Sequence, residues 1–77
     1  MDKRLFNLSS NEVTKILKKM GFTISRQKGS HIQFAGIIKN VKRRVTLISK
    51  QSHFAPKTMK SMIEQSGLSE KDWLEYL

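Results

Sequence analysis

The residues of this 77-residue chain best suited to chemistry are its two histidines, His31 and His53. An imidazole group titrates near neutral pH, so a histidine can take up or release a proton during a reaction. His31 closes the run Arg26-Gln27-Lys28-Gly29-Ser30-His31, which supplies two cations and a hydroxyl group beside it. This combination suits a reaction at a phosphate, where cations stabilise the transition state and the histidine moves the proton.

Each member of the run has an expected role at such a phosphate. Lys28 and Arg26 are expected to bind phosphate oxygens, with Lys28 on the reacting group. Gly29 permits a sharp turn and a close approach of the ligand, and the Ser30 hydroxyl can donate a hydrogen bond. His53 is a candidate second acid or base, although an ordinary loop position explains it equally well.

The charge of the chain points to a polyanionic partner. Fifteen Lys and Arg residues face six Asp and Glu residues, which gives a net charge of +9. Residues 1–60 hold fourteen of the basic and two of the acidic residues, so the positive charge is concentrated. This distribution predicts a nucleic-acid binder, and Arg43 and Arg44 are further candidate phosphate contacts. A strongly acidic protein partner is also compatible with it.

Several classes of site are excluded by composition. The chain has no cysteine, so it can form no disulfide, thiolate metal site or thiol nucleophile, which fits a cytoplasmic protein. No apolar run approaches the roughly 20 residues that span a bilayer, so no membrane segment is expected. No group of histidines and carboxylates has metal-ligand spacing, and we expect neither a metal nor another cofactor. The length predicts one domain over residues 1–77.

Residue patterns predict a helix on each side of a central strand region. Residues 9–20 begin with a capping box of Ser9 and Glu12 and continue with apolar residues at helical spacing. A second helix is expected from Pro56 to Gly67, and a short third one after Ser69. Between the first two, residues 22–27, 31–35 and 44–48 show the pattern of strands, with a turn expected near residues 39–40.

Together these elements predict an α+β fold, in which one three-stranded antiparallel sheet carries all helices on one face. Alternation predicts which side chains face the helices and which face solvent. His31, Gln33 and Thr46 are expected on the helix-free face, whereas Arg26 falls on the helix side, near a strand end. The residues expected to face the helices are Phe22, Ile24, Ile32, Phe34, Val45 and Leu47.

The order of these motifs resembles that of the HicA family. After the first helix come Gly21-Phe22, a short strand, and Arg26-Gln27-Lys28-Gly29-Ser30-His31 followed by Phe34. The later runs Arg43-Arg44-Val45-Thr46-Leu47 and Thr58 to Leu68 are also similar to the family pattern. Each motif alone is weak, but the ordered set extends over nearly the whole chain.

The resemblance implies a fold like that of a double-stranded-RNA-binding domain. It also implies a toxin of a toxin–antitoxin pair that cleaves messenger RNA without a metal, with His31 essential and a HicB-type protein as antitoxin. The chain departs from the family pattern at Lys57, where a glycine is frequent. It also lacks the proline and second histidine that often follow the third strand, so their role is not assigned to His53.

Three other functions fit parts of the pattern. A non-catalytic RNA-binding module would need the charge and the fold but not His31, which would then be an ordinary surface residue. A helix-turn-helix DNA-binding protein would lack the predicted sheet. A protein-interaction domain would use its basic surface only for an acidic partner. An antitoxin would also be such a partner, and the exposed hairpin residues Ile37 and Ile38 are its expected apolar anchor. The alternative for these two residues is an extension of the second strand that packs on the core.

Overall fold

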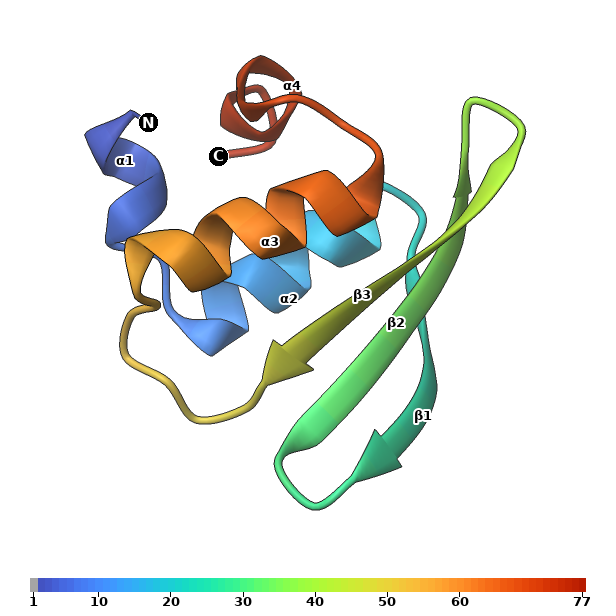
Figure 1. Cartoon of the computed structure of the whole chain (residues 1–77), viewed down its shortest axis with the longest axis horizontal. Coiled ribbons are helices and arrows are strands. Elements are labelled where there is room, and N and C mark those ends of the chain that lie inside the picture. Colours follow the sequence, from blue (N-terminus) through green and yellow to red (C-terminus); the bar gives the residue numbers. More distant parts are fainter. Residues whose placement is uncertain (1) are drawn as a thin grey trace.

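The computed structural model describes residues 2–77, and their arrangement confirms the predicted α+β class (Figure 1). Three strands form one antiparallel sheet in the order β1-β2-β3, and helices precede and follow them in the chain. The short helix α1 is an addition to the predicted elements, since four residues are too few to show a period. The elements are α1 (Lys3–Phe6), α2 (Ser10–Lys19), β1 (Thr23–Lys28), β2 (His31–Ile38), β3 (Val41–Ile48), α3 (Pro56–Ser66) and α4 (Glu70–Leu74).

Local hydrogen bonds explain where the helices begin. The predicted capping box of α2 is present, because the Ser9 hydroxyl accepts from the Glu12 amide and the Glu12 carboxylate accepts from the Ser9 amide. Ser69 and Asp72 form the same arrangement at α4. Pro56 opens α3 at a position where its missing N–H costs nothing. At α2 and α4 the capping side chains accept hydrogen bonds from amides that have no partner within the helix.

Two tight turns set the register of the sheet. Lys39 and Asn40 both have positive φ and join β2 to β3 directly, which is the geometry of a type I′ turn and confirms the predicted position. Gly29 has φ +60° at the first position of the Gly29-Ser30 turn, as a type II′ turn requires. Strands β2 and β3 are therefore longer than the predicted ranges 31–35 and 44–48, and most of residues 36–43 belongs to these two strands.

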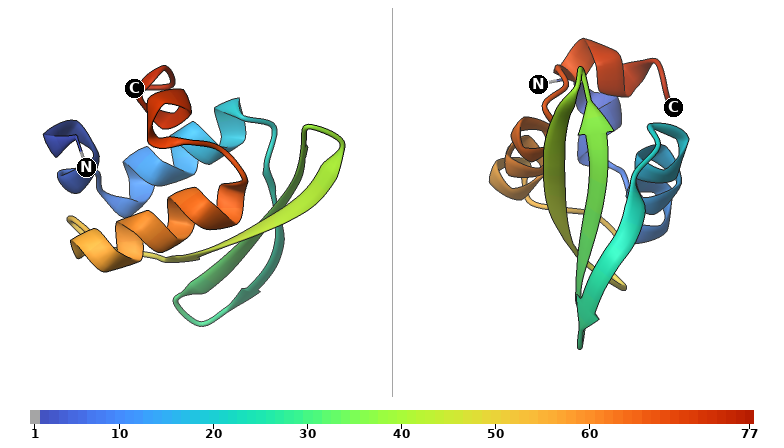
Figure 2. Two further views of the ribbon diagram at one scale, coloured as in Figure 1. Left: turned by 45° about the horizontal axis from the view of Figure 1, so that its top comes forward. Right: turned by 90° about the vertical axis from the view of Figure 1, so that its right-hand side faces the viewer.

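The core lies between the sheet and the helices. Helices α2 and α3 cover one face of the sheet, and the view from the side shows the strands in front of both (Figure 2). Phe34, Val45 and Leu47 are buried on this face against Leu17 and Met59. Residues 2–77 contain no helix long and apolar enough to cross a membrane.

One strand departs from the predicted alternation. The pairing of β1 with β2 shifts between Ile24 and Arg26, so Ser25 is an extra residue that forms a β-bulge. Arg26 consequently lies opposite Gln33 and shares its face, and the expectation that Arg26 lies on the helix side is wrong. Ile24 does lie opposite the buried Phe34, but it remains 48% exposed because β1 is an edge strand.

The chain ends pack on the helices. Leu5 of α1 and Trp73 of α4 are both buried in the common core. The Trp73 indole donates to the Ser66 hydroxyl at 2.9 Å, and the Asp2 amide donates to Glu70 at 3.3 Å. The two ends therefore lie close together on the side of the helices away from the sheet (Figure 1).

Candidate functional site on the open face of the sheet

The face of the sheet that the helices leave uncovered is here called the open face. Residues directly opposite each other on neighbouring strands project to the same side, so the register assigns its members. None of these side chains is acidic, and four are cationic. The open face consists of Thr23, Arg26, Lys28, His31, Gln33, Ala35, Ile37, Lys42, Arg44, Thr46 and Ile48.

His31 stands at one end of this face, directly after the Gly29-Ser30 turn. It is exposed, and it lies between Lys28 on β1 and Ile48 on β3, which are its partners in the two ladders. Side chains of directly opposite residues have Cβ atoms about 5 Å apart, so a phosphate beside the imidazole is within reach of the Lys28 ammonium. The next row holds Arg26 and Gln33.

The turn beside His31 is held in place from the next strand. The Ser49 amide donates to the Ser30 carbonyl at 2.8 Å, which extends the β2–β3 ladder beyond His31 and Ile48. The buried Ser10 hydroxyl donates to the Ile48 carbonyl and accepts from the Gln51 amide, both at 2.7 Å. The start of α2 is thus fixed to the end of β3, and this fixes the backbone on which His31 stands.

The cations of the open face have no carboxylate partner. Among residues 2–77 one ion pair is found, between Arg4 and Asp2 at 3.1 Å, and it lies at the N-terminus. No acidic residue occurs anywhere between Val13 and Ile63. Because no described carboxylate neutralises this positive charge, the open face attracts anionic ligands.

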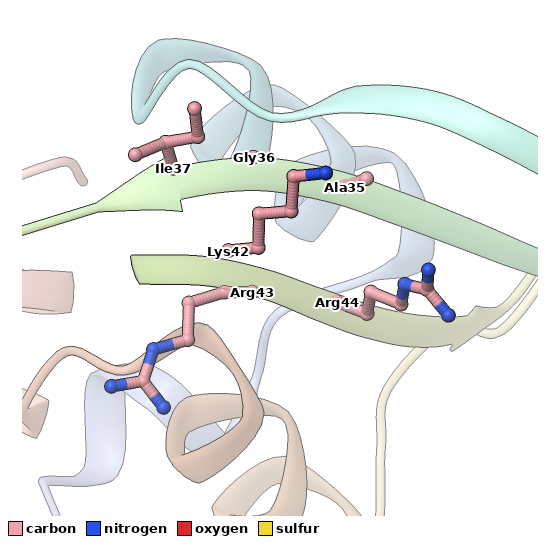
Figure 3. Close-up of a pocket in the computed structure, with 6 residues that line it drawn as sticks. All are labelled: Ala35, Gly36, Ile37, Lys42, Arg43 and Arg44. Carbon is pink, nitrogen blue, oxygen red and sulfur yellow. The ribbon is translucent and has the colours of Figure 1, made fainter. Parts of the chain in front are cut away.

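The structure separates the two adjacent arginines of β3. Arg44 is exposed on the open face opposite Ala35, whereas Arg43 lies opposite Gly36 on the helix side. The Arg43 side chain passes toward the end of α3, where a Cβ on Gly67 would lie 2.5 Å from Arg43 Nε (Figure 3). Its Nε is buried without a hydrogen-bond partner. The Arg43 side chain is therefore directed away from the side chains of the other candidate phosphate contacts.

His53 is placed differently from His31. It lies in the exposed segment between β3 and α3, and its Nδ1 is 3.1 Å from the Ser52 hydroxyl. This segment leaves the sheet after Ile48, so His53 stands outside the open face.

The two isoleucines of the expected hairpin anchor lie on opposite faces of the sheet. Ile37 is 67% exposed, whereas Ile38 is buried in the core. The expectation that Ile38 is exposed is wrong.

Lys42 is a member of the open face that the sequence did not single out. It lies opposite Ile37 and two residues before Arg44. Period-two alternation from Thr46 backward places Arg44 and Lys42 together on the solvent side, and it places Arg43 with the buried Val45. The signal that separates these residues was therefore present in the sequence.

Comparison with protein families finds one matching family. A family model described as the HicA toxin of bacterial toxin–antitoxin systems matches residues 10–68. The chain belongs to the HicA toxin family. No curated protein matches the chain closely enough to count. The HicA match runs from α2 through α3 and includes the whole open face, whereas α1 and α4 lie outside it.

Membership of the HicA family gives the general biology of the chain. The family consists of toxins from bacterial toxin–antitoxin pairs, and it is generally one of mRNA interferases. An antitoxin partner and an RNA target follow in general terms. Residues 2–77 hold no group of three or more His, Asp or Glu side chains that could share a metal ion.

Proposed function

We propose that the chain is an endoribonuclease that cleaves messenger RNA without a metal, with His31 as general acid or base. The observation that carries this proposal is the position of His31 on the open face, exposed and beside the unpaired Lys28. The face is free of carboxylates, so a phosphodiester can approach it closely.

The chemistry uses the nucleophile that RNA itself carries. The 2′-hydroxyl attacks the neighbouring phosphorus while His31 takes its proton, and the P–O5′ bond breaks. The departing 5′-oxygen takes up a proton from water, which leaves a 5′-hydroxyl on one product and a 2′,3′-cyclic phosphate on the other. The Lys28 ammonium stabilises the charge that develops on the phosphate oxygens. Ser30, Gly29, Arg26 and Arg44 are proposed contacts to the same RNA backbone.

Regulation and location follow from the family and the substrate. We propose that a HicB-type antitoxin inhibits the enzyme, and that the toxin acts in the cytoplasm, where messenger RNA is present. We also propose that residues 1–77 work as one unit, because Leu5 and Trp73 at the two ends share the core with α2 and α3.

The test compares three proteins on one mixed-sequence messenger RNA in EDTA at low salt. Wild type should cut it, and His31→Ala should lose cutting at least a hundredfold, the lower end of what proton transfer by a side chain contributes. His53→Ala is the matched control, since it removes the other imidazole from a site outside the open face, and it should retain cutting.

RNA binding separates the proposal from its main alternative. His31→Ala should still bind RNA, because the four cations of the open face remain. If wild type and both variants bind RNA and none cuts it, the chain is a non-catalytic RNA-binding module. Cutting by His31→Ala at the wild-type rate would remove His31 from the mechanism.

A further inference from the structure

A pocket lies on the open face at the end remote from His31. It has a volume of about 260 Å³, and Figure 3 shows the side chains around it. It is lined by three residues of β2 and three of β3, and the small side chain of Ala35 leaves the depression: Ala35, Gly36, Ile37, Lys42, Arg43 and Arg44. Lys42 extends toward Ala35, and Arg44 borders the other side (Figure 3).

We infer that this pocket is a second nucleotide subsite, which holds one base and its phosphate of a single-stranded RNA whose scissile bond lies at His31. The inference rests on the proposed function for the position of that bond. Substitutions that fill the pocket should weaken the binding of RNA and leave proton transfer at His31 unchanged.

The lining suits a nucleotide. The guanidinium group of Arg44 is planar and can stack on a base, while Lys42 supplies a point charge for a phosphate. The methyl group of Ala35 and the exposed side chain of Ile37 offer apolar contact to a base edge or face. Such contacts accept any base, so the subsite adds affinity more than sequence preference.

The distance along the strand sets the length of RNA required. Ala35 lies four residues after His31 on β2, and about 3.3 Å per residue gives a separation of about 13 Å. A fully stacked strand advances about 3.4 Å per nucleotide, so roughly four stacked nucleotides reach from one site to the other. A more extended strand reaches with fewer.

A protein occupant is the less favoured alternative. Among residues 2–77 no carboxylate forms an ion pair with Lys42 or Arg44, and the apolar part is the shallow surface of one alanine beside one isoleucine. An anchor residue of a protein partner needs a deeper apolar pocket than this to become fully desolvated. Charge complementarity therefore favours the RNA backbone.

The test measures binding of a fluorescent single-stranded RNA of roughly 12 nucleotides, carrying 2′-O-methyl groups so that it cannot be cut. Ala35→Val fills the floor without a change of charge, and it should raise Kd about tenfold, within the range that loss of one stacked base produces. The salt dependence of binding should stay the same, because no phosphate contact is removed.

A pair of double variants separates a local site from general attraction. Lys42→Ala/Arg44→Ala should raise Kd at least about tenfold more than Lys57→Ala/Lys60→Ala, which removes the same charge from exposed positions on α3. Lys42 and Arg44 are exposed, so their replacement by alanine should leave the fold intact. The double variant therefore tests the subsite even if Ala35→Val disturbs the packing. Ala35→Thr provides a second filling variant, and circular dichroism checks each fold.

The outcomes are decisive in both directions. An unchanged Kd for Ala35→Val and Ala35→Thr, or equal losses in the two double variants, would overturn the subsite. Weaker binding to an antitoxin with unchanged binding to RNA would overturn it as well and would assign the pocket to the protein partner. Since the RNA cannot be cut, these results are independent of whether His31→Ala abolishes cleavage.

Discussion

Ser66 is the position where the structure gives the sharpest estimate of a loss of stability. Its hydroxyl is fully buried, donates to the Ile63 carbonyl at 2.6 Å, and accepts from the Trp73 indole at 2.9 Å and the Leu68 amide at 3.2 Å. Ser66→Ala leaves the buried indole N–H without a partner, and it weakens the start of the segment that leads to α4.

The expected cost follows from these three bonds. An unsatisfied buried donor costs about 1–3 kcal/mol, and the remaining loss is about 1 kcal/mol because the Leu68 amide is only half-buried. Alanine is the better helix former by about 0.5 kcal/mol, which offsets part of the loss. We expect a net destabilisation of about 2–3 kcal/mol, or roughly 10–20 °C in Tm for a domain of this size.

Urea unfolding measures this loss, followed by circular dichroism in every variant and also by the fluorescence of Trp73 where that residue is present. Trp73→Phe removes the indole N–H, so Ser66→Ala should cost at least about 1 kcal/mol less in that background than in wild type. The reasoning is refuted if Ser66→Ala costs less than about 0.5 kcal/mol, or if its cost is the same in both backgrounds.

Three further predictions address the hairpin, the end of α3 and the start of α4. Ile38→Ala should cost about 2–4 kcal/mol in urea unfolding, whereas Ile37→Ala on the other face should stay within about 0.5 kcal/mol. Gly67→Ala should cost more than the roughly 1–2 kcal/mol of its positive φ, because its Cβ meets Arg43, and the excess should vanish in an Arg43→Ala background. Hydrogen bonds from the capping serine of α4 lower the pKa of Asp72 below its usual 3.8, so this carboxylate stabilises the fold above that pH and ceases to do so as the pH falls through the lowered value. The stability difference between wild type and Asp72→Ala should therefore shrink between neutral pH and about pH 2, and an undiminished difference would contradict the assignment.

Local signals in the sequence were sufficient for the helices and turns. Each of these signals determines the backbone conformation of only a few neighbouring residues. The structure has the Ser9–Glu12 box, Pro56 and the Lys39-Asn40 turn where the pattern predicted them. Helix α1 begins with a local signal, because the Asp2 carboxylate accepts from the Arg4 amide at 2.9 Å. Its four residues are too few to show a helical period, and burial of Leu5 in the common core stabilises the helix.

The errors arose where pairing between strands decides the outcome. The bulge at Ser25 moves Arg26 to the open face, and nothing in β1 alone shows that an extra residue sits there. Ile24 has the alternation of a core residue but lies on an edge that the helices do not reach. The charge pattern predicts Arg43 and Arg44 together as phosphate contacts, whereas alternation directs adjacent strand residues to opposite faces.

The two edges of the sheet differ, and this limits how the chain can associate with copies of itself. On β3 the Thr46 amide donates to the Gln65 side chain of α3 at 3.0 Å, so the outer edge of that strand is partly occupied from within the molecule. Strand β1 is interrupted by its bulge and carries Arg26 and Lys28, which discourage pairing without blocking it. Growth of a fibril by strand addition requires two usable edges on every molecule, whereas one edge allows only a pair. The Gln65 side chain thus makes the β3 edge a poorer site for strand addition, which matters in a chain of 77 residues with a marginal core.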